Sequence, residues 1–249
     1  QAFKKYYDTD GKWRAPWSDG RRTWYPPNSE YVLFGQADTF VHDLISEKNR
    51  HLFPASRRNS AAGMLSDLYV NFYIWIGNEL KKELPGKRLG VLAYHNYTLP
   101  PVVCKNIPDN IDVQVCSGRI VMSKADASQK QWREIFKGWY DALGKRQVTA
   151  WTYGAQGTAF TQAIQGRYMR DYINCIRPWL SRDGLFFDAS GLRWNYYYSY
   201  YAVYRAFWNP DFDYDAALEE HWEKLYGKKA GAALKAFYRL LVERWEKVY

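Results

Sequence analysis

Two aspartates stand at or just after the ends of short apolar runs, where paired carboxyl groups could do acid–base chemistry. Asp38 follows the run at residues 31–35, and Asp188 ends the run at residues 184–188. Cleavage of a glycosidic bond needs one protonated carboxyl group as acid and one ionised group as base or nucleophile. An aspartate at such a position also caps a helix or closes a turn, and that structural alternative stays open for both residues.

A second group of candidates shares the same kind of position and offers rings and hydrogen-bonding groups. These side chains are Tyr94, His95, Asn96, Arg119, Trp151, Tyr153 and Trp194. Aromatic rings can stack on the C–H faces of sugars, and histidine can bind hydroxyl groups or move a proton. The sequence therefore predicts a substrate-binding role for them. Packing of the rings at the rim and a turn-stabilising role for His95 are the structural alternatives.

Other site chemistries find little support in the spacing of the residues. The three cysteines form no CxxC pair, and His42 with Asp43 and Glu47 matches no metal-ligand signature. The sequence also has no dinucleotide fingerprint, no phosphate loop and no nucleophile elbow. We therefore expect no metal and no cofactor. His51 and His221 are expected at the surface.

The elements that must position these candidates follow from the pattern of apolar runs. Five short runs read as strands, at residues 31–35, 89–94, 111–116, 148–151 and 184–188. The first of them is apolar without alternation, which favours a strand buried on both faces. Amphipathic helices between several of them predict parallel pairing with right-handed crossovers, so that the carboxyl ends of the strands meet at one edge.

This pattern predicts an α/β fold, the later part of a (β/α)8 TIM-type barrel with about five parallel strands and a C-terminal helical extension. The other strands of a closed barrel would precede Gln1 or come from another segment. We expect a partial barrel over residues 1–194, with residues 1–30 as a loop arm, and the helical extension over residues 195–249.

Helix details can be predicted at two places. Ser66 can cap a helix that ends near Leu84, with an apolar stripe whose members recur every four residues: Leu68, Phe72, Ile76 and Leu80, widened by Tyr69, Tyr73 and Trp75. Gly227 is expected to end the helix at about 215–226. The last helix, at about 230–248, is predicted to bury Leu234, Phe237, Leu241 and Trp245.

Composition narrows the classes of partner. The 249 residues carry a formal net charge of +9, but the basic residues occur in short pairs and form no run of five. Nucleic acid is therefore a weak candidate partner. No apolar stretch approaches the roughly 18 residues of a membrane span, so no membrane partner is expected. Aromatic residues make up 18%, which suits both a packed core and stacking on ligands.

Several segments resemble a bacterial family of unknown function whose members look like glycoside hydrolases, similar to α-glucuronidases and β-hexosaminidases. The matching segments are residues 89–94, Leu99-Pro100-Pro101, residues 111–116, Phe207-Trp208-Asn209-Pro210-Asp211 and Leu225-Tyr226-Gly227. They occur in the family's order across residues 31–249.

The resemblance implies a barrel completed by an upstream segment and glycan processing in the periplasm or outside the cell. The leading hypothesis is a glycoside hydrolase-like protein with Asp38 and Asp188 as its carboxylates. Its substrate would be a polysaccharide or glycan, and one that contains uronic acids would suit the net charge of +9. The alternative is a non-catalytic carbohydrate-binding barrel that keeps the cleft and lacks a working acid.

Overall fold

The computed structural model describes residues 29–35, 45–117, 126–153, 159–188 and 197–248. Candidates Asp38, Arg119 and Trp194 lie outside these ranges. The main elements in chain order are β1 (Tyr31–Phe34), α2 (Ser66–Glu83), β2 (Arg88–Ala93), β3 (Ile111–Ser117), α3 (Asp126–Ala142), β4 (Val148–Tyr153), α4 (Ala159–Ile176), β5 (Leu180–Asp188), α5 (Tyr197–Trp208) and α6 (Tyr214–Val248).

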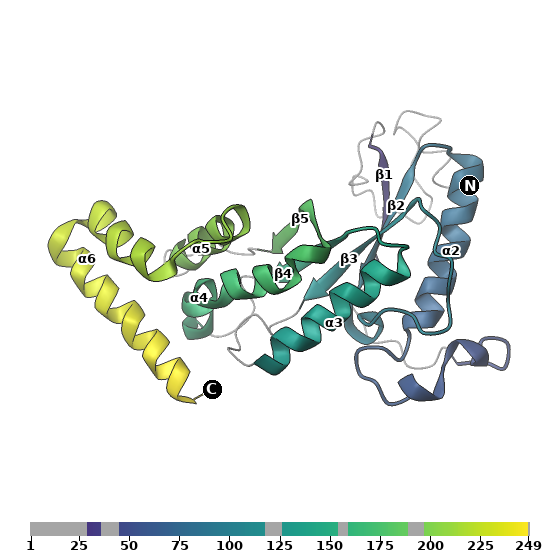
Figure 1. Ribbon diagram of the computed structural model, residues 1–249, viewed down its shortest axis with the longest axis horizontal. Coiled ribbons are helices and arrows are strands. Elements are labelled where there is room, and N and C mark those ends of the chain that lie inside the picture. The colour runs from purple at the N-terminus through teal and green to yellow at the C-terminus, as the bar shows by residue number, and fades with distance from the viewer. Residues whose placement is uncertain (1–28, 36–44, 118–125, 154–158, 189–196, 249) are drawn as a thin grey trace, which may run out of the picture. The chain divides into compact units, whose positions relative to one another are not determined.

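The strands form one five-stranded parallel sheet in the order β1-β2-β3-β4-β5. The register pairs Phe34 of β1 with Val91 of β2, and Ala93 of β2 with Val115 of β3. These findings confirm a mixed α/β protein with a parallel sheet and a helical C-terminal end (Figure 1). Neighbouring parallel strands end at the same edge of the sheet, so the carboxyl ends of β1 and β2 lie together.

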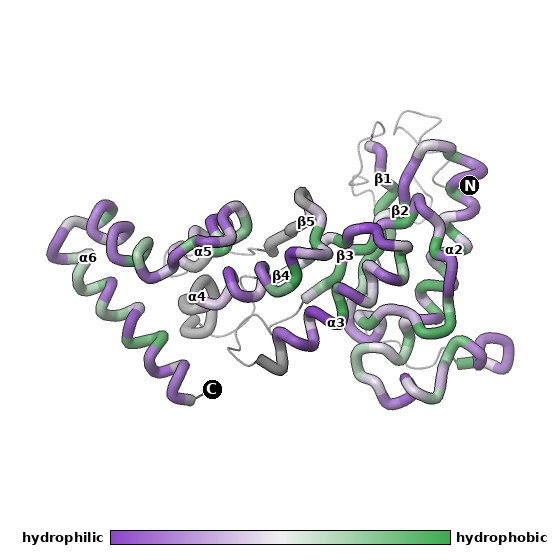
Figure 2. The backbone as a smooth tube through the Cα atoms, in the orientation of Figure 1, coloured by the Kyte–Doolittle hydropathy of each residue, from purple (hydrophilic) through white to green (hydrophobic). Residues whose placement is uncertain are grey.

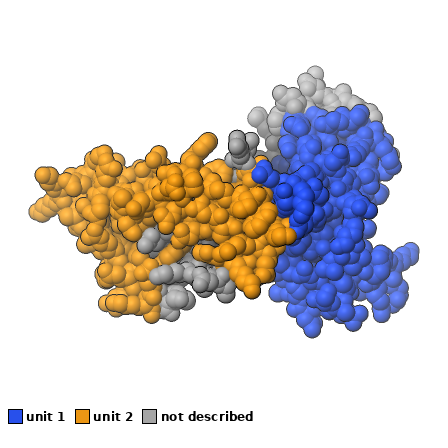
Figure 3. All heavy atoms as spheres, in the orientation of Figure 1, with its two compact units in different colours: residues 1–115, 138–148 blue, residues 116–137, 149–249 orange. Residues whose placement is uncertain are grey.

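The chain divides into two compact units, which are described separately (Figure 3). Unit 1 comprises residues 1–115 and 138–148, and unit 2 comprises residues 116–137 and 149–249. The division at residue 194 that the sequence analysis made stays a prediction.

In unit 1, helix α2 packs on one face of the sheet (Figure 1). Burial alternates along β2: Leu89, Val91 and Ala93 are buried, while the residues between them are half-buried. Helix and sheet approach closely at Gly77, where an added Cβ would stand 2.7 Å from Cδ1 of Ile111. The buried Asn110 side chain donates a hydrogen bond to the Gly77 carbonyl at 2.9 Å.

The buried stripe of α2 differs from the predicted one. The buried apolar and glycine positions of this helix are Val70, Tyr73, Gly77 and Leu80. Trp75 is 59% exposed and stacks on the exposed Phe72, with ring centroids 5.7 Å apart. The helix turns Tyr73 and Gly77 toward the sheet because the glycine permits close approach there and the Tyr73 hydroxyl donates to the Leu92 carbonyl at 3.3 Å.

The predicted Ser66 cap is also wrong. Leu65 is the N-cap residue and makes no side-chain cap hydrogen bond, and Ser66 is the first residue of the helix. Within the described ranges, the buried Ser66 Oγ has no hydrogen-bond partner.

In unit 2, helix α4 packs against α5 and α6. An aromatic core joins α5 and α6, in which Tyr198, Trp222 and Tyr238 are fully buried. Gly227 interrupts α6 with φ 73°, which confirms the predicted helix end, because this left-handed conformation favours glycine. Phe237 is 44% exposed, so the predicted buried face of the last helix was wrong at this position, where neighbouring Tyr238 enters the core instead.

His51 and His221, which were both expected at the surface, differ in exposure. His51 is exposed, but His221 is half-buried and stacks on Tyr201, with ring centroids 4.6 Å apart. Burial lowers the pKa of His221. The helical periodicity of the sequence does not reveal that His221, a polar residue of α6, faces the tyrosine-rich helix α5.

None of the described helices is both long and apolar enough to cross a membrane. Along α6, hydrophilic and hydrophobic residues alternate throughout, whereas β2 and β3 are mostly hydrophobic (Figure 2).

Candidate functional site

The candidate site of unit 1 lies where β1 and β2 end. The connection from β1 to α2 and the segment after β2 are joined there by two backbone hydrogen bonds. Leu65 N–H donates to the Asn96 carbonyl, and Leu99 N–H donates to the Ala62 carbonyl, each at 2.9 Å. The two segments therefore form one layer at the carboxyl edge of the sheet.

His95 opens the short helix η3 (His95–Tyr97) directly after β2 and has φ 46°. A left-handed conformation in a non-glycine residue costs about 1 to 3 kcal/mol and persists only where the surroundings hold it. Thr98 contributes to that hold, because its Oγ1 donates to the His95 carbonyl at 2.9 Å. Thr98 is itself fixed from α3, since Trp139 Nε1 donates to the Thr98 carbonyl at 2.8 Å.

The three predicted binding residues after β2 differ in exposure. The Tyr94 and His95 rings are half-buried neighbours, with centroids 3.7 Å apart. Tyr94 also packs against a buried apolar cluster that includes Phe53 and Tyr97. Asn96 is buried. Tyr94 and His95 are therefore the members of this group with surface to offer a ligand, and the binding role of all three stays a prediction.

Asp67 holds this edge together and was not among the sequence candidates. It lies buried in the first turn of α2, and its carboxylate accepts hydrogen bonds from three successive backbone N–H groups, those of Val102, Val103 and Cys104, at 2.7 to 3.1 Å. The thiol of Cys104 donates to the Asp67 carbonyl at 3.2 Å. The sequence signal is an acidic residue in the first helical turn, which is common in helices and gave no indication of the loop it binds.

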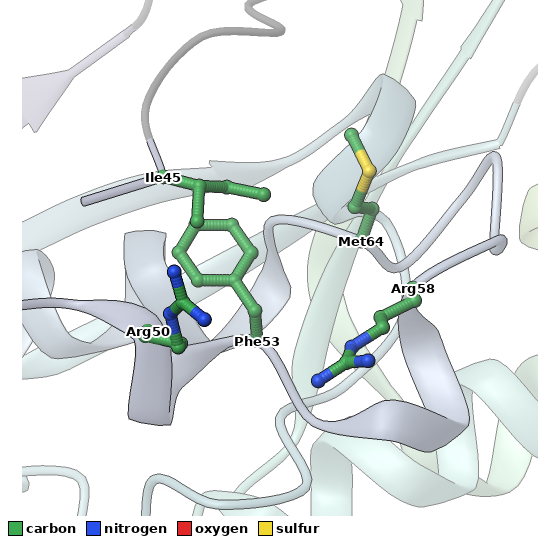
Figure 4. Close-up of a pocket in the computed structure, with 5 residues that line it drawn as sticks. All are labelled: Ile45, Arg50, Phe53, Arg58 and Met64. Atoms are coloured by element: carbon green, nitrogen blue, oxygen red, sulfur yellow. The ribbon is translucent and has the colours of Figure 1, made fainter. Parts of the chain in front are cut away.

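A pocket of about 220 Å³ lies in the connection between β1 and α2. Its lining residues are Ile45, Arg50, Phe53, Arg58 and Met64. Figure 4 shows the Arg50 guanidinium beside the Phe53 ring and Arg58 on the other side of Phe53. Phe53 belongs to the apolar cluster that Tyr94 also contacts, and Met64 packs against that cluster. This arginine pocket is therefore part of the same edge of unit 1, and the sequence analysis missed it because its residues are scattered in a polar stretch.

In unit 2, two more candidates stand at strand ends. Tyr153 is the last residue of β4 and Asp188 the last residue of β5, as the predicted strand-end positions require, although their side chains lie outside the description. Trp151 is half-buried, and its carbonyl accepts a hydrogen bond from the buried Ser117 Oγ at 3.1 Å. The catalytic and binding roles of these residues stay predictions.

In the described part of the chain, no group of three or more His, Cys, Asp or Glu side chains could hold a metal ion. Cys104, Cys116 and Cys175 form no disulfide within the described residues. Burial raises the pKa of Cys104 to about 11, with a further contribution from Asp67, and burial raises the pKa of Cys175 to about 11.

Comparison with known proteins gives a family and no closer relative. Neither the curated proteins nor the solved structures contain a match to this chain. The family model "Domain of unknown function (DUF4838)" matches residues 26–239. This match covers most of the chain, including every strand and the candidate site of unit 1, and the chain therefore belongs to that family.

Proposed function

We propose that the protein is a glycoside hydrolase-like protein that acts on a polysaccharide or glycan, with Asp38 and Asp188 as its carboxylate pair. In this proposal the sheet is part of a (β/α)8 barrel, and Tyr94, His95, Asn96, Arg119, Trp151, Tyr153 and Trp194 surround the sugar. Such a protein would act in the periplasm or outside the cell.

The observation that carries the proposal is the sequential order of the five parallel strands. Doubly wound sheets reverse their strand order at a switch point, whereas barrels keep neighbouring strands in chain order. Barrel enzymes build their active sites at the carboxyl ends of the strands. Asp188 stands at such an end, and the tyrosine–histidine pair after β2 adds an aromatic face and a hydrogen-bonding ring.

Separate substitution of the two aspartates tests the proposal. Asp38→Asn and Asp188→Asn each remove a carboxyl group and keep the size of the side chain. Loss of a general acid or base lowers rates by about 10²- to 10⁴-fold, so kcat for release of reducing sugar from a glycan panel is expected to fall by that factor. Asp211→Asn is the matched control, because Asp211 is exposed in the break between α5 and α6. Undiminished turnover in both site variants would reject the carboxylate pair.

The second candidate is a non-catalytic carbohydrate-binding protein, and Asp67 favours it. Within the described ranges, the buried carboxylate at the carboxyl edge of unit 1 is occupied by backbone N–H groups. The Asp67 carboxylate holds the loop at residues 102–104, and because it is buried and bonded there, it does not face a substrate as an acid would. Oligosaccharide binding by calorimetry, together with no reducing-sugar release by the wild-type protein, would support this reading over hydrolysis.

A further inference from the structure

The arginine pocket combines positive charge with an apolar wall. Among the described residues that line it, two of the five are arginines and none is acidic. Phe53 and Met64 supply the apolar wall, and Phe53 is 6% exposed and belongs to the buried cluster with Leu65 and Tyr97. An anion that also has an apolar face can therefore contact the guanidinium groups and this wall together.

The guanidinium groups of Arg50 and Arg58 have N–H donors that can bind a ligand. The Arg58 guanidinium has neither a hydrogen bond nor an ion pair within the described ranges, and only the backbone N–H of this residue is paired, with the Ala55 carbonyl. Arg50 pairs with Glu47 at 2.5 Å, but the side chains are 65% and 84% exposed, and such surface pairs contribute little. Each guanidinium has five N–H donors in a planar fork that matches the two oxygens of a carboxylate.

The size of the pocket limits the occupant to a single small group. Its volume of about 220 Å³ is below the roughly 300 Å³ at which pockets for drug-sized ligands begin. A sugar ring that bears a carboxylate has both an apolar C–H face for Phe53 and an anionic group for the arginines. A neutral sugar would offer the guanidinium groups no negative charge, and a bare inorganic anion would leave the apolar wall without a contact.

We propose that the arginine pocket binds one uronate unit of an acidic glycan, with a guanidinium group of the pocket on its carboxylate and the apolar wall of Phe53 and Met64 against its ring. The sugar part of this inference rests on the proposed carbohydrate function, whereas carboxylate binding does not require hydrolysis. Binding is therefore measured without turnover, so that an inactive protein can still satisfy the inference.

Calorimetric titration of the 249-residue chain with glucuronate, glucose and inorganic sulfate tests the proposal. Glucuronate is expected to bind, more weakly as salt rises, and glucose and sulfate are each expected to bind at least tenfold more weakly. An oligosaccharide that ends in glucuronate separates a glycan from the free sugar acid as the source, and the glycan is expected to bind more tightly. Equal binding of glucuronate and sulfate would reduce the pocket to a site for any anion and overturn the proposal.

Variants locate the binding in the pocket. Arg58→Gln removes the charge of an exposed side chain, and a lost hydrogen bond to a charged group lowers affinity by about 10- to 100-fold. Arg50→Gln should lower it to a similar extent. Arg57→Gln is the matched control, because Arg57 is adjacent in sequence but lies beside Gly63 and does not line the pocket. Absence of glucuronate binding by the wild-type protein, or an equal loss in Arg57→Gln and Arg58→Gln, would overturn the proposal.

Discussion

At the scale of single residues, the carboxylate of Asp67 has a structural role, because backbone N–H groups donate hydrogen bonds to both of its oxygens. Its oxygens accept hydrogen bonds from three backbone N–H groups of the β2–β3 connection, and it lies at the N-terminal end of α2, where the helix dipole favours negative charge. Both effects fix the segment at residues 102–104 to the helix, next to the loop that carries Tyr94 and His95.

Replacement of Asp67 should therefore destabilise the protein rather than change any chemistry. Asp67→Asn removes the charge and places amide hydrogens where N–H donors already point, and hydrogen bonds to a charged group are worth about 1.5 to 3 kcal/mol. We expect the free energy of unfolding, from urea denaturation, to fall by about that amount or more. Asp109→Asn is the control, since Asp109 is an exposed partner of Lys81 and such surface pairs contribute about 0 to 1 kcal/mol. Equal effects of the two variants would contradict the role of Asp67 in holding residues 102–104 to α2.

The half-buried thiols of Cys104 and Cys175 give a prediction about pH. Cys104 and Cys175 have pKa values raised from 9.0 to about 11 by burial, so their thiolate fraction near pH 8 is about a hundredfold lower than that of an ordinary thiol. Native protein should therefore react with a thiol reagent about that much more slowly than the urea-unfolded chain. Since the folded state holds these protons more tightly, the stability they contribute is present below about pH 9 and is lost as the pH rises toward 11. Equal rates for native and unfolded protein at pH 8 would contradict the prediction.

At the scale of elements, helix α2 shows what periodicity predicts and what it leaves open. The sequence predicted the helix and its end near residue 84, because apolar residues recur at helical spacing and Leu84-Pro85-Gly86 follows. The rotation of the helix about its axis could not be predicted. It depends on where the helix can approach the sheet most closely, and that place is a glycine, which contributes nothing to an apolar stripe.

Gly77 tests this packing. Gly77→Ala gains helix propensity of about 1 kcal/mol but places a Cβ at 2.7 Å from Ile111 Cδ1, and overpacking of this kind costs about 1 to 3 kcal/mol. We expect net destabilisation in thermal or urea unfolding. The exposed neighbour Asn78→Ala, which gains propensity without a clash, should be neutral or stabilising. The double variant Gly77→Ala/Ile111→Val removes the nearest methyl group and should recover part of the loss. A stabilised Gly77→Ala protein would mean that the helix does not pack as described.

At the scale of the whole molecule, the five parallel strands and the helical C-terminal end could be predicted because short apolar runs and helical stretches alternate in sequence. The strand ends differ from the predicted ones by at most two residues, except that β5 begins at Leu180 instead of residue 184. Part of the candidate site could also be predicted, since Tyr94 and His95 follow β2 directly. The arginine pocket could not, because its residues come together within the β1–α2 connection, whose sequence carries no periodic signal. The role of Asp67 could not, because this residue of α2 binds residues 102–104 of the β2–β3 connection, which also carries no such signal.

The central claim is that the carboxyl edge of this sheet cleaves glycosidic bonds with two carboxyl groups. Its most direct test is the release of reducing sugar from a panel of neutral and uronic-acid-containing glycans by the wild-type protein, with the double variant Asp38→Asn/Asp188→Asn measured in parallel. We expect release from at least one glycan by the wild-type protein and none above background by the double variant. Release at the same rate by both proteins would contradict it.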